Sequence, residues 1–401
     1  MKKGFKIAGI ALGIIVVFFT ILVVWQWDTV RFVLDNYDAL QEGNEWVADL
    51  EEPEDLLDYM EAHKDKFSFQ VIRLNDTDDK LSWRADSKQP VASTYKILVL
   101  AEVARQIEEG DLDPDQMVPV DEVRAFYLPR TDGEAHQEAF RQFEADGLIH
   151  QENVALREVI RAMVRWSDNA ATDYLIHRVG RENLEDLITG LDHENLEVPF
   201  PINGAYLLWE NHEMQNTPEE RLTEYRQMDR NELIDEIYAA SGRMNEDDEF
   251  RQAEQSRLEE SRLGLGLEMQ RVFTQDTTPL GTAEAYTEIL RSVFLGDFIS
   301  VEVSGRMQEF LEWPMTNERI QRDFSQFGSK GGSLPAVFTS ASYGRPHDGD
   351  PIIAAVFFQD LHFAVWFHLK QQHLHHEFEL QLMKNEDFWE EVESRVEAWH
   401  Q

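Results

Sequence analysis

The chain has 401 residues, and its 37 lysines and arginines against 77 aspartates and glutamates give a formal net charge of −40. A charge of that sign repels phosphate backbones, which excludes nucleic acid as a partner. The hydrophobic content of 42% excludes disorder along the whole chain. The absence of cysteine excludes disulfides, thiolate metal sites and cysteine nucleophiles.

The N-terminal segment predicts a membrane anchor. Residues 7–27 carry no charge, and a helix of this length can cross the hydrocarbon core of a bilayer. Lys2, Lys3 and Lys6 precede this run, and positive charge stays on the cytoplasmic side. We therefore predict a cytoplasmic tail at 1–6 and a single-pass helix in the cell membrane, with the bulk of the chain extracytoplasmic (periplasmic). The alternative is a cleaved signal peptide, but the run does not end in an A-x-A-like site.

Hydrophobic patterns divide the rest of the chain. Residues 28–50 are acidic and predict a stalk, and one domain is expected at 51–401. Strands are expected at 67–74, 81–85, 324–330, 336–343 and 351–358. Helices are expected at about 53–60, 93–109, 154–166, 169–179, 283–295 and 378–399. This order predicts an α+β fold, in which an antiparallel sheet is built from both chain ends around a helical middle.

A charged helical insertion is expected at about 205–272. Its central part, 217–262, holds 14 acidic and 7 basic residues with few large apolar ones. Burying so many unpaired charges would cost several kcal/mol each. We therefore expect this segment to lie outside the core, so that its deletion would leave thermal stability nearly unchanged.

Ser93 and Lys96 begin the most apolar helix of the domain. Their spacing of three places the hydroxyl and the amine on one helix face. The helix N-terminus offers unpaired backbone N–H groups to a developing oxyanion. The apolar residues that follow predict burial, which lowers a lysine pKa and leaves a neutral amine able to take a proton from serine. Such a pair also arises by chance about 0.5 times in this composition, so it needs further support.

Two further motifs supply that support. Ser167-Asp168-Asn169 lies between two predicted helices, and chance produces this tripeptide only about 0.05 times. Lys330-Gly331-Gly332 ends a predicted strand. Together and in this order, the three motifs resemble the active-site set of the serine β-lactamase and penicillin-binding protein superfamily. The resemblance is closest to class A β-lactamase-like serine hydrolases, covers roughly residue 53 to the C-terminus and implies the β-lactamase/D,D-peptidase-like fold.

The resemblance implies a chemical role for each matching residue. Ser93 would be the nucleophile, and Lys96 would help to activate it. Ser167 would pass a proton to the leaving nitrogen, and the backbone amides of Ser93 and Ser333 would form the oxyanion hole. The implied reaction runs through an acyl-enzyme on β-lactams or D-Ala-D-Ala-type peptidoglycan ends, without a cofactor.

Substrate binding is implied for a second set of residues. Asn169 would hold the substrate's side-chain amide, Asp168 would hold the turn, and Lys330 would supply positive charge near the substrate carboxylate. Gly332 belongs to the same substrate-binding strand. The family usually has threonine or serine after its lysine, where this chain has Gly331. Carboxylate recognition would then need another group, such as Ser329 or Ser333.

Besides Gly331, the sequence departs from the family pattern at the residues that support deacylation. Class A enzymes carry a glutamate with an asparagine four residues later, and this pair holds the deacylating water. Between residues 180 and 277 no glutamate has asparagine at that spacing. Glu210 and Glu213 are candidates by proximity only. An acyl-enzyme would therefore form and hydrolyse slowly. The alternative is a non-catalytic, envelope-bound binding module that keeps the fold with a degraded site.

The C-terminal histidines give no metal-binding pattern. They are His362, His368, His373, His375 and His376. No HExxH or comparable ligand spacing is present, and their neighbours have an amphipathic helical pattern. We therefore interpret them as surface histidines and expect no metal site.

Overall fold

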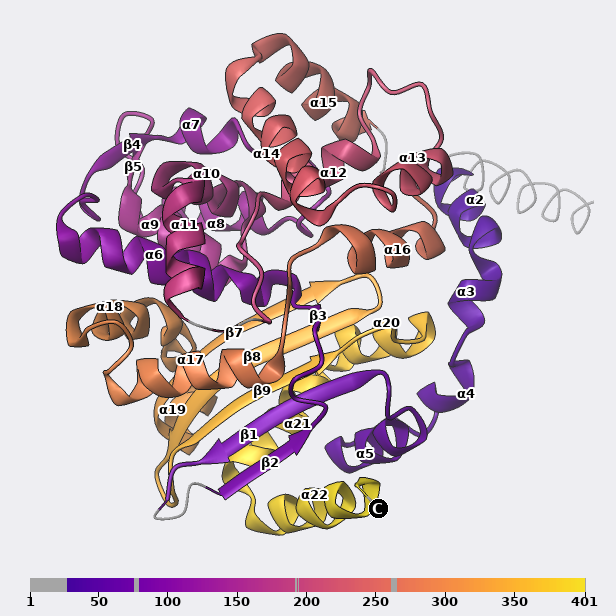
Figure 1. Ribbon diagram of the computed structural model, residues 1–401, viewed down its shortest axis with the longest axis vertical. Coiled ribbons are helices and arrows are strands. Elements are labelled where there is room, and N and C mark those ends of the chain that lie inside the picture. The colour runs from indigo at the N-terminus through magenta and orange to yellow at the C-terminus, as the bar shows by residue number, and fades with distance from the viewer. Residues whose placement is uncertain (1–26, 76–78, 192, 194, 261–264, 401) are drawn as a thin grey trace, which may run out of the picture.

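The computed structural model describes residues 27–75, 79–191, 193, 195–260 and 265–400 (Figure 1). The strands of its main sheet are β1 (Phe67–Arg73), β2 (Asp79–Trp83), β7 (Phe324–Leu334), β8 (Val337–Pro346) and β9 (Ile352–Phe358). They are antiparallel throughout, in the order β2-β1-β9-β8-β7. The sheet thus joins both ends of the domain, which confirms the predicted α+β arrangement.

The two faces of the sheet support separate hydrophobic cores. Successive residues of a strand point to opposite faces, so Phe357 of β9 joins one core and Phe358 the other. Helix α17 (Ala283–Leu295) covers the first face. The helices on the second face are α5 (Pro53–Ala62), α20 (Phe363–Gln372), α21 (Leu374–Lys384) and α22 (Glu386–Trp399). The expected single C-terminal helix is therefore two, because Asn385 ends the first and caps the second.

A helical part packs on the α17 side of the sheet (Figure 1). Its helices are α6 (Lys96–Glu109), α7 (Val120–Arg124), α8 (Ala135–Ala145), α9 (Leu156–Arg161), α10 (Asn169–Val179), α11 (Arg181–Gly190) and α18 (Val301–Leu311). Helix α6 is buried along most of its length. It ends at Gly110, whose φ of +83° is a left-handed C-cap conformation that favours glycine.

Short elements complete the domain. The paired short strands are β3 (Gln89–Pro90) with β6 (Leu280–Gly281) and β4 (Met117–Pro119) with β5 (Asn153–Ala155). The remaining turns of helix are two 3₁₀ turns (Ala92–Tyr95 and Trp313–Thr316), a π-helical turn (Ala162–Trp166) and α19 (Glu318–Asp323). The first 3₁₀ turn and the π-helical turn each lead into one of the motifs found in the sequence.

The predicted stalk at 28–50 is packed against the domain. It forms α2 (Trp27–Asp35), α3 (Tyr37–Gln41) and α4 (Asn44–Val47), and the last two contact α20. The side chain of Asn36 accepts a hydrogen bond from the backbone of Leu267 at 2.6 Å. The acidic composition suggested a solvated segment, but apolar side chains such as Leu50 are buried against the domain and make this packing favourable.

The predicted anchor at 7–27 lies outside the described residues except for Trp27. Within the part of the chain that the structure describes, no helix has the length and apolar character to span a bilayer.

The charged insertion has a hydrophobic core of its own. Its helices are α12 (Ile202–Trp209), α13 (Pro218–Tyr225), α14 (Arg230–Glu246), α15 (Asp248–Glu260) and α16 (Leu267–Thr277). Ile237, Phe250 and Leu258 are buried in this core, together with Trp209 and Phe273. The expectation that 217–262 lies outside any core is therefore wrong. The charges form ion pairs on the outer surface, while one apolar residue per turn suffices to bury the inner face.

Candidate active site

Ser93 lies in the 3₁₀ turn before α6, held against the sheet. Its neighbour Thr94 is buried, and the Thr94 and Thr339 hydroxyl groups lie 2.8 Å apart. Ala92 has a φ of +43°, a conformation that non-glycine residues rarely adopt and that is typical of functional sites. A Cβ at Gly332 would lie 2.5 Å from the Ser93 amide nitrogen, so only glycine lets strand β7 approach the nucleophile this closely. This approach places Gly332 and Ser333 beside the Ser93 amide, as an oxyanion hole requires.

Lys96 is fully buried under Ser93 on the first turn of α6. Its Nζ donates to the Ser167 carbonyl oxygen at 2.6 Å and to Asn169 Oδ1 at 2.8 Å, and it lies 3.3 Å from Ser167 Oγ. Burial lowers the pKa of Lys96 to about 8, although nearby carboxylates, chiefly that of Asp168, oppose the shift. About a tenth of this amine is therefore neutral at pH 7 and able to accept a proton, far more than for an ordinary lysine.

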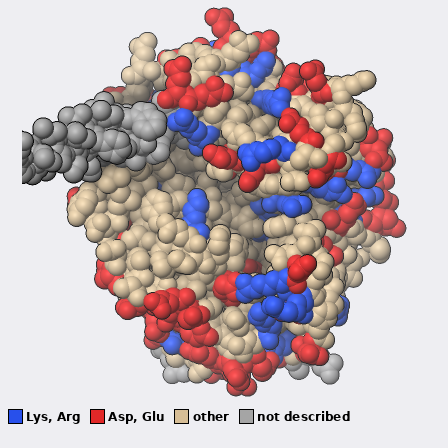
Figure 2. Space-filling view, turned by 180° about the vertical axis from the view of Figure 1, so that it is seen from behind, with Lys and Arg blue, Asp and Glu red and all other residues tan. Residues whose placement is uncertain are grey.

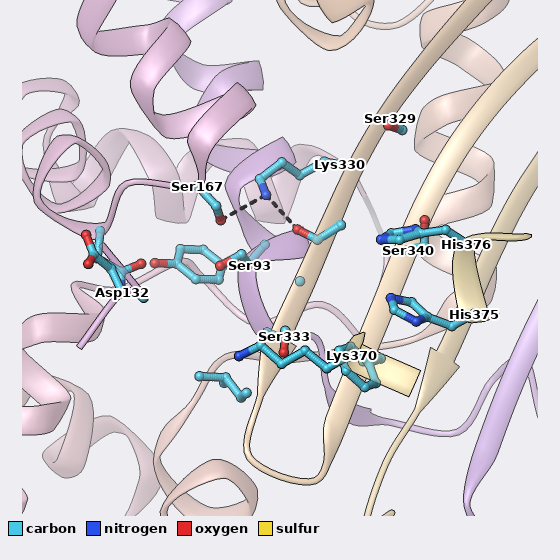
Figure 3. A pocket seen from close by; sticks show the side chains of 18 of the residues that line it. Ser93, Asp132, Ser167, Ser329, Lys330, Ser333, Ser340, Lys370, His375 and His376 are labelled. Atoms are coloured by element: carbon cyan, nitrogen blue, oxygen red, sulfur yellow. Dashed lines mark hydrogen bonds between the residues drawn. The ribbon is translucent and has the colours of Figure 1, made fainter. Parts of the chain in front are cut away.

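Ser167 connects the two lysines. It follows the π-helical turn with a φ of +66°, which aims its hydroxyl into the cavity rather than along a helix. Lys330 Nζ, from β7, donates to Ser167 Oγ at 3.0 Å and to the Gly331 carbonyl oxygen at 2.6 Å (Figure 3). Burial and then the charge of Lys96 lower the pKa of Lys330 well below its ordinary value. The two amines and the hydroxyl form a continuous path for a proton.

Asp168 holds the turn of the second motif. One carboxylate oxygen accepts from the backbone N–H groups of Ala170 and Ala171, which caps α10, and the other lies 2.8 Å from His136 Nδ1. Burial alone would raise the pKa of Asp168, but His136 and the backbone N–H donors outweigh it and lower the pKa. Asp168 is fully buried, so it positions Ser167 and Asn169 and does not reach a substrate.

These groups surround a cavity of about 820 Å³. That volume is in the range of small-molecule sites. The predicted residues that line it are Ser93, Ser167, Asn169, Lys330, Gly332 and Ser333. Lys96 lies behind this wall, in contact with Ser167 and Asn169. The structure therefore brings together all seven residues that the sequence singled out.

Residues 53–374 match the family model described as the β-lactamase enzyme family. The chain belongs to this family. It is accordingly a β-lactamase-like serine hydrolase. The matched segment contains all three motifs and ends before His375.

Solved structures similar to this β-lactamase-family chain include two β-lactamases and the protein PBP-A. The β-lactamase from Sphaerobacter thermophilus is 16% identical, with a TM-score of 0.47, over 81% of this chain and 95% of that one. The β-lactamase from Chitinophaga pinensis is 15% identical, with a TM-score of 0.47, over 80% and 97%. PBP-A is 14% identical, with a TM-score of 0.45, over 82% and 96%. No curated protein matches the sequence.

Among the described residues that follow the second motif and precede β7, none that lines the cavity is a glutamate. Ile202 and Tyr206 line the cavity there, from the first turn and a half of α12. Buried Asp173 accepts from the backbone N–H groups of Ile202 and Asn203, both at 3.0 Å, which fixes this turn. Sequence reasoning passed over Ile202 and Tyr206, although they have the spacing of four that it sought for glutamate and asparagine.

Glu210 and Glu213 do not line the cavity. Arg257 Nη1 donates to Glu210 Oε1 at 2.7 Å. Arg243 donates to both carboxylate oxygens of the exposed Glu213, at 2.6 and 2.7 Å. The two candidates named from the sequence therefore belong to ion pairs of the insertion.

The interpretation of the C-terminal histidines as surface residues is wrong for His375, which is buried, whereas His373 and His376 are exposed. All three line the cavity, and Figure 3 shows His375 and His376 on the side of β7 away from Ser93. His375 stacks on Phe338 with a ring distance of 4.3 Å. The helical pattern suggested exposure, but it could not indicate that α21 lies against the active-site strand. Among the described residues, no cluster of histidine and acidic side chains has an arrangement that could hold a metal ion.

Proposed function

We propose that this serine hydrolase forms an acyl-enzyme through Ser93 with β-lactams or D-Ala-D-Ala-type peptidoglycan ends, and that it deacylates slowly. The observation that carries this proposal is the path Lys96, Ser167, Lys330, with contacts of 3.3 and 3.0 Å around the Ser167 hydroxyl. A nucleophile with a neutral buried amine beside it and a second hydroxyl ready to donate is the set that acyl transfer to a cyclic or peptide amide needs.

Acylation follows from these positions. Neutral Lys96 accepts the Ser93 hydroxyl proton while Oγ bonds to the carbonyl carbon. The oxyanion that develops is stabilised by the backbone amides beside Ser93 and Ser333. When the carbon–nitrogen bond breaks, Ser167 gives its proton to the leaving nitrogen and regains one from Lys96. Lys330 offsets negative charge next to Ser167 throughout.

The site provides fewer catalytic groups for deacylation than for acylation. A water molecule must attack the ester carbonyl, and a nearby carboxylate within about 2.6–3.2 Å of that water is the usual base. Ile202 and Tyr206 occupy the wall after the second motif, so neither can accept that proton as a carboxylate would. Lys96 remains as a weaker base, which supports slow residual turnover.

Covalent labelling tests the proposal. A fluorescent penicillin should label the wild-type chain, with the label on the peptide that contains Ser93, and Ser93→Ala should lose it. Ser325→Ala is a matched control on the far end of β7, where the hydroxyl donates to the Arg345 carbonyl oxygen. Absence of label with every β-lactam and activated ester tried would favour the non-catalytic binding module.

We further propose that the chain is anchored in the cell membrane with its bulk outside the cytoplasm. The support is the uncharged run at 7–27, with lysines only before it. Full-length protein should sediment with membranes and resist carbonate extraction, and protease added outside the cell should reach the domain. A soluble product with a new N-terminus after residue 27 would contradict the anchor and favour a cleaved signal peptide.

A further inference from the structure

Gly331 leaves a position on β7 without a side chain, next to Lys330. A Cβ built there would lie 3.6 Å from His376 Cε1 and 3.5 Å from the Thr339 carbonyl oxygen. The imidazole of His376, from α21, therefore borders the space that a hydroxyl at residue 331 would occupy. His376 is exposed and lines the cavity, so the ring is open to a ligand there.

The hydroxyl groups of Ser340 and Ser342, on the strand paired with Gly331, are committed elsewhere. Ser340 pairs with Gly331 across the strands, and its hydroxyl donates to buried Glu379 at 2.6 Å. Ser342 also donates to this carboxylate. In Figure 3, Ser329 lies apart from Ser93 and Ser167, at the other end of the labelled group. His376 is consequently the better placed donor beside Gly331.

The charge of the cavity is opposite to that of the chain. Four basic and two acidic residues line it, namely Arg130, Arg165, Lys330, Lys370, Asp132 and Glu379, whereas acidic residues outnumber basic ones by 77 to 37 in the sequence. Figure 2 shows a face on which basic side chains gather around a hollow while acidic side chains dominate the edge. Such an arrangement attracts an anionic ligand into a cleft.

We propose that His376, together with Lys370 from the lining of the same cavity, recognises the carboxylate of the substrate at the position where Gly331 supplies no hydroxyl. This inference rests on the proposed acylation of Ser93. Desolvation by the surrounding protein, and then the charge of His373, lower the pKa of His376 to about 4, so His376 acts as a neutral N–H donor. Lys370 adds positive charge from the last turn of α20. Lys370 lies at the end of the segment that matches the family model, and His376 lies just after that segment.

Two probes that differ only in the carboxylate test this assignment. Nitrocefin carries the free carboxylate, and its methyl ester carries the same reactive ring without that charge. The second-order rate constant for acylation of Ser93 is measured for both. His376→Ala should lower it about tenfold or more for nitrocefin, the loss expected for a hydrogen bond to a charged group, and should leave the ester unchanged. His347→Ala, in the exposed turn after β8, is the matched control and should change neither rate constant.

A rescue variant gives the expectation a second readout. Gly331→Ser in the His376→Ala background returns a hydroxyl to the strand. The position tolerates a side chain, because its Cβ meets only ordinary van der Waals contacts. Acylation by nitrocefin should recover most of the lost rate, with no change for the ester.

Three outcomes would overturn the assignment. An equal loss for both probes would mean that His376 supports the fold or the nucleophile. No loss for either would mean that the carboxylate is held elsewhere. If neither probe acylates the wild-type chain, the proposed function itself fails and the assignment fails with it. The ester rate also reports whether each variant is folded.

Discussion

Two walls of the same cavity differ in chemistry. The wall built by α6, the second motif and β7 carries Ser93, Ser167 and Lys330, with Lys96 behind them. The wall built by α12 carries Ile202 and Tyr206. The first wall has what is needed to form an acyl-enzyme, and the second lacks the carboxylate that usually helps to hydrolyse it. The two halves of a hydrolase cycle thus depend on different segments, and one can be retained without the other.

The local packing explains why each wall is stable as it stands. Both lysines on the first wall are buried, but their ammonium protons have oxygen acceptors at 2.6–3.0 Å, as buried charges require. On the second wall, Tyr206 stacks on Phe273 with a ring distance of 4.6 Å and so joins the core of the insertion. The core of the insertion therefore continues to the cavity wall and makes that wall apolar.

Removing the amine from the first wall should have the largest effect. Lys96→Met keeps an unbranched side chain of similar length but removes the base and the proton path to Ser167. The acylation rate constant should fall about 10²–10⁴-fold, the range for general acid–base catalysis. Stopped-flow measurement with nitrocefin gives the value. A loss below about tenfold would mean that Lys330 or another group is the base.

The pH profile of acylation checks the same residue without a mutation. Lys96 must be neutral to accept a proton, and its pKa is about 8. The neutral fraction grows as the pH rises through that value, so acylation should accelerate from pH 6 to about 8 and level off above it. The rise should be absent in Lys96→Met. A rate that falls over this interval would contradict the assignment.

The core of the insertion gives the next largest effect. Phe250 is 3% exposed and packs with the apolar residues of α12 and α14. Phe250→Ala should lower the free energy of unfolding by about 3–5 kcal/mol, as for other buried aromatic residues. Denaturation by guanidinium, followed by fluorescence, measures this change. Glu249→Ala, at the exposed neighbouring position, is the control. An unchanged free energy of unfolding in Phe250→Ala would instead support the expectation from composition, that residues 217–262 lie outside any core.

Much of the fold was predictable because its signals are local. Alternation indicated β1, strand-forming runs between turn residues indicated β7 to β9, and Gly110 and Gly180 follow the ends of α6 and α10. The candidate site residues were predictable because three short motifs, in this order, resemble those of a known family, whereas the spacing of Ser93 and Lys96 alone also arises by chance. These features can be read from the local sequence without knowledge of the tertiary contacts.

The missed features depend on long-range contacts. Composition described 217–262 by its charges, although Ile237 and Phe250 decide its packing. Nothing near His376 in the sequence indicates that it borders Gly331, 45 positions earlier, because only the pairing of β7 with β8 and the packing of α21 bring them together. Proximity in the sequence likewise suggested Glu210 and Glu213, whereas Ile202 is the residue that lines the cavity.

A carboxylate at residue 202 should give the α12 wall the base for deacylation that it lacks. Ile202→Glu places it on the cavity wall at the N-terminus of α12, where the helix dipole favours negative charge. We expect the wild-type chain to show a burst of nitrocefin hydrolysis followed by a slow steady state, and the variant to deacylate about tenfold faster, a part of the full effect of a general base. Ile202→Gln, which has the same shape without the charge, should remain slow. Rapid wild-type turnover without a burst would show that an efficient base already exists.

The smallest effect is expected for the two glutamates that the sequence suggested. Glu210→Gln and Glu213→Gln each remove a carboxylate from an ion pair with Arg257 or Arg243, and neither residue lines the cavity. The hydrogen bond from Arg243, opposed by slight burial, lowers the pKa of Glu213, so this group is ionised but held at the surface. Such pairs contribute little to stability because water and salt screen them. Steady-state hydrolysis of nitrocefin should therefore be the same in both variants as in the wild type. A lower turnover in either variant, with unchanged acylation, would identify that glutamate as the deacylating base and would require the insertion to bring it to the cavity in the acyl-enzyme.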